Sequence, residues 1–193
     1  MININHQKKG GLWFGVAFEN DIVFATSFSR DEEKTLKTIL SSLPLNKHFQ
    51  LTEKQTEFSS TVMETMSKVC EGEDVPSTFN FHLDPFPSFT MKVLRCVHMI
   101  PVGYVTSYGE VAKAVHVPHA SRAVGNVMAR NPFAPLIPCH RVVRSNFKLG
   151  GYGGGLDLKM EILSKEDRGY QSPLLLNLQD GPFHVFPISF LKL

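Results

Sequence analysis

The sequence predicts an α/β fold in two parts: a small α/β domain in residues 1–87 and a mostly helical domain in residues 88–169. Two runs rich in aromatic and β-branched residues, 12–18 and 22–28, flank a short polar loop, which is typical of a β-hairpin. Three prolines within residues 72–87 mark a linker, and helical periodicity dominates after it. The apolar, proline-broken tail, 170–193, is expected to pack on the body.

Two helices are expected in the first domain. Asp31 is a candidate N-cap of a helix that ends before Pro44, with an apolar stripe made of Leu36, Ile39, Leu40 and Leu43. A second helix, capped by Thr52, is expected over about 53–70, and its stripe consists of Phe58, Val62, Met66 and Val69. One further short strand is expected within residues 72–87.

In the second domain, the pattern predicts a helix over 89–100 and two short helices after it. Ser107 and Glu110 stand in capping-box spacing before a helix that continues to Val115, and residues 119–130 form the next helix. Two short helices behind a longer one are the arrangement of a helix-turn-helix. Many helical hairpins share this pattern and bind nothing, so the pattern alone leaves a helix-turn-helix and a plain helical hairpin both open.

The surface of the 119–130 helix leaves two interpretations open. Small residues at Ala120, Ser121, Ala123, Gly125 and Ala129 would let this helix approach a nucleic acid closely, with Arg122 and Arg130 meeting phosphates or bases. Equally, the small residues pack helix against helix while both arginines are solvated. Without further observations the second interpretation is favoured.

A reactive cysteine is predicted at Cys139. Its neighbours Pro138, His140 and Arg141 supply a rigid turn, an imidazole and a positive charge, and apolar residues flank the group on both sides. A cysteine nucleophile needs a group that takes its proton and limited access to water. Arg141 is expected to be structural, tying the turn by hydrogen bonds.

Composition bounds the remaining possibilities. The three cysteines, Cys70, Cys96 and Cys139, contain no CxxC pair, which argues against a disulfide framework and a four-cysteine zinc site. Cys70 and Cys96 lie on apolar stripes and are expected to be core residues. A net charge of +2 permits nucleic-acid binding without indicating it. Neither a secretory signal nor a membrane-spanning run is present, so an intracellular protein is expected, cytoplasmic or, in a eukaryote, nuclear.

A glycine-rich loop, 150–155, precedes a short final helix, 158–166. The loop lacks the lysine and Ser/Thr ending of a P-loop, so a flexible or closely approaching loop is predicted. On the helix, Asp157, Lys159 and Lys165 are interpreted as a solvated face.

Taken together, these motifs resemble the O6-alkylguanine-DNA alkyltransferase family. The resemblance runs from Phe89 to about Glu166 without insertions. It rests on Pro-Cys-His-Arg-Val at 138–142, Arg-Ala-Val-Gly at 122–125, Asn131-Pro132, Ser107-Tyr108, and the tyrosine-containing glycine loop with Lys159 and Glu166 behind it. The first domain resembles the family in outline only, as a small RNase H-like α/β domain. The second would be a winged helix-turn-helix-like domain that carries the cysteine.

The resemblance implies DNA repair by a methylated-DNA–protein-cysteine S-methyltransferase. An alkyl group, typically methyl, would move from O6 of guanine, and also from O4 of thymine, in duplex DNA onto Cys139. Because the thioether product is not reversed, each molecule would act once, as a monomer and without cofactor or metal. The lesion base would be flipped out of the duplex.

The resemblance also implies residue roles. His140 would take the thiol proton through a bound water, Glu166 would orient His140, and Asn131 would order the Cys139 turn. Tyr108 would protonate or hydrogen-bond guanine N3. The substrate would contact Tyr152, Gly153 and Val142. Arg122 would fill the vacated stack, and the remaining DNA contacts would come from Ser121, Ser145 and Tyr108, with the helix in the minor groove.

The sequence departs from the family pattern at several positions, and two other functions remain open for Cys139. With Cys70 as the only cysteine of the first domain, no structural zinc is expected. Gly153 and Ala134 stand where some relatives carry Ser and Pro, which leaves the width of the pocket open. A winged-helix regulator with Cys139 as a redox sensor predicts reversible oxidation. A cysteine hydrolase using Cys139 and His140 predicts turnover.

Overall fold

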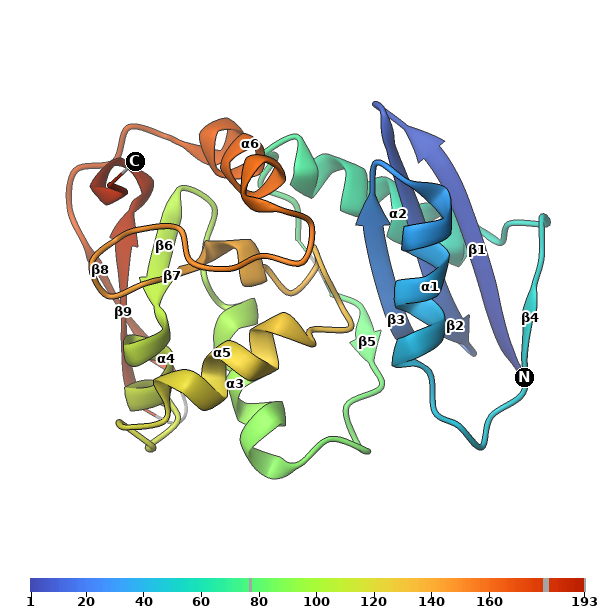
Figure 1. Cartoon of the computed structure of the whole chain (residues 1–193), viewed down its shortest axis with the longest axis horizontal. Coiled ribbons are helices and arrows are strands. Elements are labelled where there is room, and N and C mark those ends of the chain that lie inside the picture. The colour runs from blue at the N-terminus through green and yellow to red at the C-terminus, as the bar shows by residue number, and fades with distance from the viewer. Residues whose placement is uncertain (77, 179–180, 193) are drawn as a thin grey trace. The chain divides into compact units, whose positions relative to one another are not determined.

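The computed structural model describes residues 1–76, 78–178 and 181–192, and it confirms a mixed α/β fold (Figure 1). Its residues form two compact units. The first consists of Met1–Cys70, Val75–Pro85 and Pro132–Leu136, and the second of Glu71–Asp74, Phe86–Asn131 and Ile137–Leu193. The contiguous division into 1–87, 88–169 and 170–193 stays a prediction.

A five-stranded sheet forms the centre of the first unit. Its strands are β1 (Ile2–Lys9), β2 (Leu12–Glu19), β3 (Ile22–Ser29), β4 (Phe49–Leu51) and β5 (Asn80–Phe81), in the order β4-β1-β2-β3-β5. The central strand β2 pairs antiparallel with both β1 and β3, while β4 and β5 run parallel to their neighbours β1 and β3. The predicted short strand within 72–87 is β5.

The predicted hairpin is confirmed as β2 and β3. Asn20 and Asp21 connect the strands with φ values of 50° and 58°, the left-handed backbone of a two-residue hairpin turn. Strand β1 was not predicted, because its residues are mostly polar. Only Ile2 and Ile4 supply an apolar alternation, and both are buried.

Two helices, α1 (Glu32–Ser42) and α2 (Glu57–Cys70), complete the first unit. Asp31 caps α1 as predicted, because its Oδ1 accepts from the Lys34 backbone N–H at 2.7 Å. The cap predicted at Thr52 is wrong. The Thr52 N–H donates to the Ile4 carbonyl and extends the sheet, so α2 begins five residues later.

The segment Pro132–Leu136 belongs to the first unit although it lies more than a hundred residues after β3. Thr26 of β3 holds it twice: its backbone N–H donates to the Pro132 carbonyl at 2.7 Å, and its Oγ1 donates to the Ala134 carbonyl at 2.8 Å. Phe133 is fully buried and packs on Phe81, with ring centroids 4.8 Å apart.

The second unit combines four helices with a four-stranded sheet. The helices are α3 (Ser88–His98), α4 (Tyr108–Ala114), α5 (Ser121–Ala129) and α6 (Leu156–Glu166), and two 3-10 turns are η1 (Cys139–Arg141) and η2 (Ile188–Phe190). The strands β6 (Tyr104–Ser107), β7 (Val142–Val143), β8 (Leu174–Leu178) and β9 (Gly181–Pro187) lie in the order β7-β6-β9-β8 (Figure 1).

The four helices match the predicted ones, with shifted ends. Ser107 is the N-cap of α4, its Oγ accepting from the Glu110 N–H at 3.1 Å. The Glu110 carboxylate pairs instead with Lys113 and His184. Cys70 and Cys96 are buried, as expected of core residues. Among the described residues no helix is long and apolar enough to cross a membrane, and no three His, Cys, Asp or Glu side chains are grouped to hold a metal ion.

Replacing Thr26 with valine tests the hold on the 132–136 segment. Thr26→Val keeps the shape of the side chain but leaves the Ala134 carbonyl without its donor. We expect the free energy of unfolding to fall by about 1–3 kcal/mol, measured by urea denaturation. Thr26→Ser should restore most of it. Thr38→Val, which removes an exposed hydroxyl from α1, is the matched control and should change little. An equal loss of stability in Thr26→Val and Thr38→Val would show that the Thr26 hydroxyl does not hold the 132–136 segment.

Candidate active site

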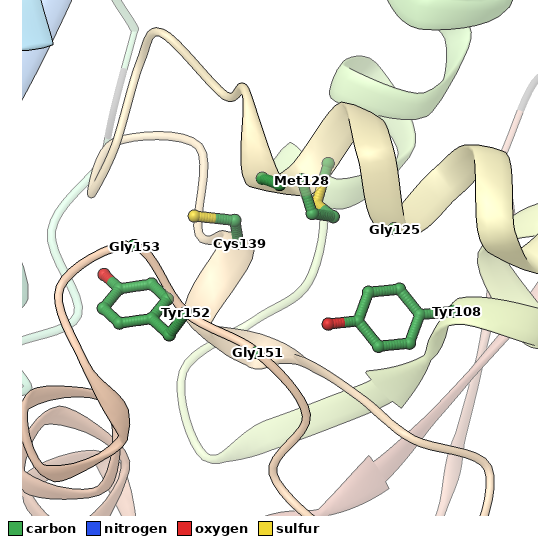
Figure 2. A pocket seen from close by; sticks show the side chains of 8 residues that line it. Tyr108, Gly125, Met128, Cys139, Gly151, Tyr152 and Gly153 are labelled. Carbon is green, nitrogen blue, oxygen red and sulfur yellow. The ribbon is translucent and has the colours of Figure 1, made fainter.

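A cavity of about 450 Å³ opens beside Cys139 in the second unit (Figure 2). The start of α4, one face of α5, the turn η1 and the glycine loop contribute its walls, which consist of Tyr108, Gly125, Met128, Ala129, Cys139, Gly151, Tyr152 and Gly153. Its size lies within the roughly 300–1,000 Å³ of small-molecule sites. The only thiol in the wall is Cys139.

Cys139 is the first residue of η1 and is 7% exposed. A tight turn forms because the Cys139 N–H donates to the Ile137 carbonyl at 2.8 Å and the Arg141 N–H donates to the Pro138 carbonyl at 2.9 Å. Asn131 is hydrogen-bonded to this turn, since its Nδ2 donates to the same Ile137 carbonyl at 2.8 Å.

Burial raises the pKa of the Cys139 thiol, while a hydrogen bond from the Asn131 side chain and the nearby charge of Lys159 oppose that rise. The resting residue is therefore a thiol at neutral pH. It needs an acceptor for its proton before it can act as a nucleophile.

His140 and Glu166 form the predicted pair, and both are fully buried. His140 Nε2 lies 2.9 Å from Glu166 Oε1. Arg141 holds the same carboxylate with two hydrogen bonds, from Nε to Oε2 at 2.9 Å and from Nη2 to Oε1 at 2.8 Å. The structural role expected for Arg141 is thus confirmed, and its Nη1 also donates to the Ile100 carbonyl at 2.6 Å.

The charges of this group follow from its contacts. Burial alone would raise the pKa of Glu166, but attraction and hydrogen bonds from His140 and Arg141 hold that pKa at about 2. Burial lowers the pKa of His140, against the attraction of Glu166. Glu166 is therefore ionised and His140 neutral at pH 7, so Nε2 carries the proton that is donated to Glu166. The buried Nδ1 has no hydrogen-bond partner among the described residues and is the free acceptor.

The prediction that Lys159 is solvated is wrong. Lys159 is fully buried, and its Nζ donates to the carbonyls of Val142 at 2.7 Å and Leu149 at 2.6 Å. Burial lowers its pKa to about 8. The spacing of residues on α6 could have indicated this burial. Lys159 lies on the buried helix face that continues with Ile162, Leu163 and Glu166.

Two tyrosines border the cavity. Burial, and secondarily the proximity of Cys139, raises the pKa of the Tyr108 hydroxyl, so this hydroxyl remains a proton donor. Gly150, with φ of 71°, passes so close that a Cβ there would lie 3.1 Å from the Tyr108 oxygen. The predicted close approach of the loop is confirmed at this point. Around Gly153, by contrast, a Cβ would meet open space, so the cavity is roomy at that wall.

The other predicted site residues do not line the cavity. Val142 is fully buried in β7 and does not line the cavity; its carbonyl instead accepts from Lys159. Arg122 and Ser121 are exposed in the first turn of α5. Arg122 shares the helix face of Gly125 and Ala129, which line the cavity. Ser145 is exposed in the turn after β7.

Sequence reasoning missed the contributions of Met128 and Ala129 to the cavity wall. The available signal was their position one helical turn after Gly125, on the same helix face. Met128 was not distinguishable from an ordinary core residue by type alone.

The second unit is similar in sequence to proteins of known family. Residues 88–168 match the family model of the 6-O-methylguanine DNA methyltransferase DNA-binding domain. The methylated-DNA–protein-cysteine methyltransferase of Mycolicibacterium paratuberculosis is 46% identical over 103 residues, which cover 53% of this chain and 61% of that protein. The chain thus spans less than two thirds of the length of this curated relative.

Solved structures extend the similarity to both units. Mycobacterium tuberculosis OGT in complex with DNA matches with a TM-score of 0.69 at 27% identity, over 85% of this chain and 92% of that one. The O6-methylguanine DNA methyltransferase from Methanococcus jannaschii matches with a TM-score of 0.61 at 30% identity, over 86% and 95%. At this identity and coverage, the chain belongs to the O6-methylguanine-DNA methyltransferase family.

Proposed function

We propose that this chain repairs DNA by moving a methyl or other alkyl group from guanine O6 in a duplex to Cys139, once per molecule. The observation that carries the proposal is the buried group behind the thiol: an ionised Glu166 that orients a neutral His140 with its Nδ1 free to accept a proton. This group adjoins a cavity with space for one base. The relatives' names support the same activity.

In the proposed step, the thiol proton passes through a water molecule to His140 Nδ1 as Sγ attacks the alkyl carbon in line. The new S–C bond forms while the C–O6 bond breaks, and the electron pair of that bond leaves on the guanine. Tyr108 donates to guanine N3, which stabilises the leaving base. The proton taken from the thiol finally replaces the alkyl group on guanine. The product is a thioether, so the protein does not turn over.

DNA binding is proposed for the α4–α5 pair, as a helix-turn-helix within a winged domain. A base inside a duplex cannot place its O6 beside a buried thiol, so it must flip into the cavity. Arg122, on the helix face that leads to the cavity, would fill the vacated stack. The small residues of α5 suit the minor groove. Ser121 and Ser145, both exposed, would contact phosphates. Action on O4 of thymine, a monomeric state and an RNase H-like first domain belong to the same proposal.

The direct test uses duplex DNA that contains O6-methylguanine. We expect the protein mass to rise by one methyl group, located on the Cys139 peptide by mass spectrometry. Cys139→Ala should bind the same duplex but acquire no methyl group, and Cys96→Ala is the matched control with full transfer. Multiple turnovers, or reversible oxidation of Cys139 without an adduct, would contradict the proposal.

The role of Glu166 is testable by pH. Wild-type transfer should be fast at pH 7 and stay fast as the pH falls through the ordinary histidine pKa of about 6.5. It should slow only at lower pH, because burial lowers the pKa of His140 and the imidazole is therefore protonated later. Glu166→Gln removes the charge that stabilises the imidazolium, so the transfer rate should fall by about 10²-fold across the neutral range.

Glu161→Gln is the control, since Glu161 lies on the same helix and pairs with the half-buried Lys165 at the protein surface rather than with His140. Circular dichroism would verify folding, because the change leaves Arg141 without its carboxylate. A folded Glu166→Gln protein with the wild-type rate and pH profile would refute the relay.

Arg122→Ala tests base flipping. Without the side chain that fills the stack, transfer from the duplex should slow by roughly tenfold, equivalent to ~1.4 kcal/mol. Transfer from the free base O6-methylguanine should be unchanged, because no stack is opened. Arg95→Ala removes an exposed arginine from α3 and should alter neither rate. Equal slowing on duplex and free base would reject this role for Arg122.

A further inference from the structure

We infer that the C-terminal segment, through Phe186, Phe190 and Lys192, holds the turn at residues 144–148 in the shape that meets the DNA backbone. The inference rests on the proposed function and gives the last part of the chain a role in binding. Residues 144–148 are called the 144–148 turn below. The three C-terminal residues act as positioning residues, since they work through this turn.

The 144–148 turn has the composition of a phosphate-binding surface. Arg144, Ser145, Asn146 and Lys148 are exposed, and the turn contains no acidic residue. Two cations, a hydroxyl and an amide are the groups that contact phosphate oxygens in protein–DNA complexes.

The turn also lies beside the cavity. Gly150 connects the two regions, because a Cβ at this glycine would lie 3.5 Å from Arg144 Cγ and 3.1 Å from the Tyr108 oxygen. A backbone bound at the 144–148 turn would therefore run past Tyr108, at the wall of the cavity. The position of the turn thus affects how a flipped base enters the cavity.

The backbone of the turn is held in an unfavourable conformation. The Arg144 N–H donates to the Lys148 carbonyl, and the Phe147 N–H donates to the Arg144 carbonyl, both at 2.9 Å. Phe147 has φ of 62°, a left-handed value that is uncommon for a bulky residue. Such a conformation persists only where the surroundings impose it.

Those surroundings come largely from the C-terminal segment. The Phe147 ring packs edge-on against Phe186 and Phe190, with centroids 5.2 and 5.9 Å away. The Lys192 N–H donates to the Phe147 carbonyl at 3.0 Å. Ile188 and Leu191 join the apolar cluster on which Phe147 lies.

The C-terminal segment is itself fixed to β6, the strand that leads into Ser107 and Tyr108. Strand β9 pairs with β6, and the Thr106 hydroxyl donates to the His184 carbonyl at 2.8 Å. The Ile188 N–H donates to the Gly103 carbonyl at 3.0 Å. One rigid sheet therefore carries both the start of α4 and the aromatic residues that hold the 144–148 turn.

Lys192 offers a matched pair of variants for the test. Lys192→Pro removes the N–H that holds Phe147, whereas Lys192→Ala keeps it; both remove the same charge. Leu191, with φ of −60° and ψ of 137°, already has the extended backbone that precedes a proline without strain. Phe190→Ala removes one of the two rings, and Leu175→Ala, at an exposed apolar residue of β8, is its control.

The measurement is the affinity for undamaged duplex DNA as a function of salt concentration. Relative to Lys192→Ala, we expect Lys192→Pro to bind more weakly and to lower the slope of log Kd against log salt by about 1, as for one lost phosphate contact. Phe190→Ala should do the same relative to Leu175→Ala. Transfer from the free base O6-methylguanine should stay within about twofold of wild type, since tenfold would need ~1.4 kcal/mol at the chemical step.

The outcomes separate the two proposals. Equal affinity and salt slope for Lys192→Pro and Lys192→Ala would overturn the positioning role, even if Phe190→Ala failed to fold. Equal loss of free-base transfer and duplex binding would also overturn it, because it would indicate general unfolding. Absence of transfer by the wild-type protein from either substrate would reject the proposed function. The DNA affinities of Lys192→Pro and Lys192→Ala would then still decide whether Lys192 positions the 144–148 turn.

Discussion

The carboxylate of Glu166 is the group on which the proposed chemistry of the second unit depends. It is a fully buried charge, which is costly unless it is paired and hydrogen-bonded. Arg141 satisfies it with two planar hydrogen bonds, and His140 uses the remaining acceptor capacity. Arg141 and His140 adjoin Cys139 in η1, so the end of α6 and the cysteine turn are locked together by one charge. The same contact that stabilises the turn selects the tautomer of His140.

How far the sequence could predict this arrangement depended on the range of the interactions. Local signals were sufficient for the hairpin of β2 and β3 and for the caps at Asp31 and Ser107, because each depends on residues a few positions apart. Strand β1 escaped prediction, since its place in the sheet comes from pairing with β2 and β4 rather than from its own polar residues.

The site was predictable as a set of residues but not as a set of contacts. The motif around Cys139 named His140 and Glu166 through a family resemblance, whereas no spacing rule links residues 26 positions apart. Lys159 was misjudged because a lysine is ordinarily solvated; two backbone carbonyls, at Val142 and Leu149, make its burial tolerable. Val142 thus serves the site with its carbonyl rather than with its side chain.

The segment Pro132–Leu136 has a consequence for how the chain acquires its structure. Phe133 is fully buried in the first unit, yet it is made long after the strand that receives it. During synthesis, the two hydrogen bonds from Thr26 to this segment cannot form until the segment has left the ribosome. By then α3, α4 and α5 have already been made. The first unit is therefore completed by a piece of chain that is synthesised late and that also connects α5 to the cysteine turn.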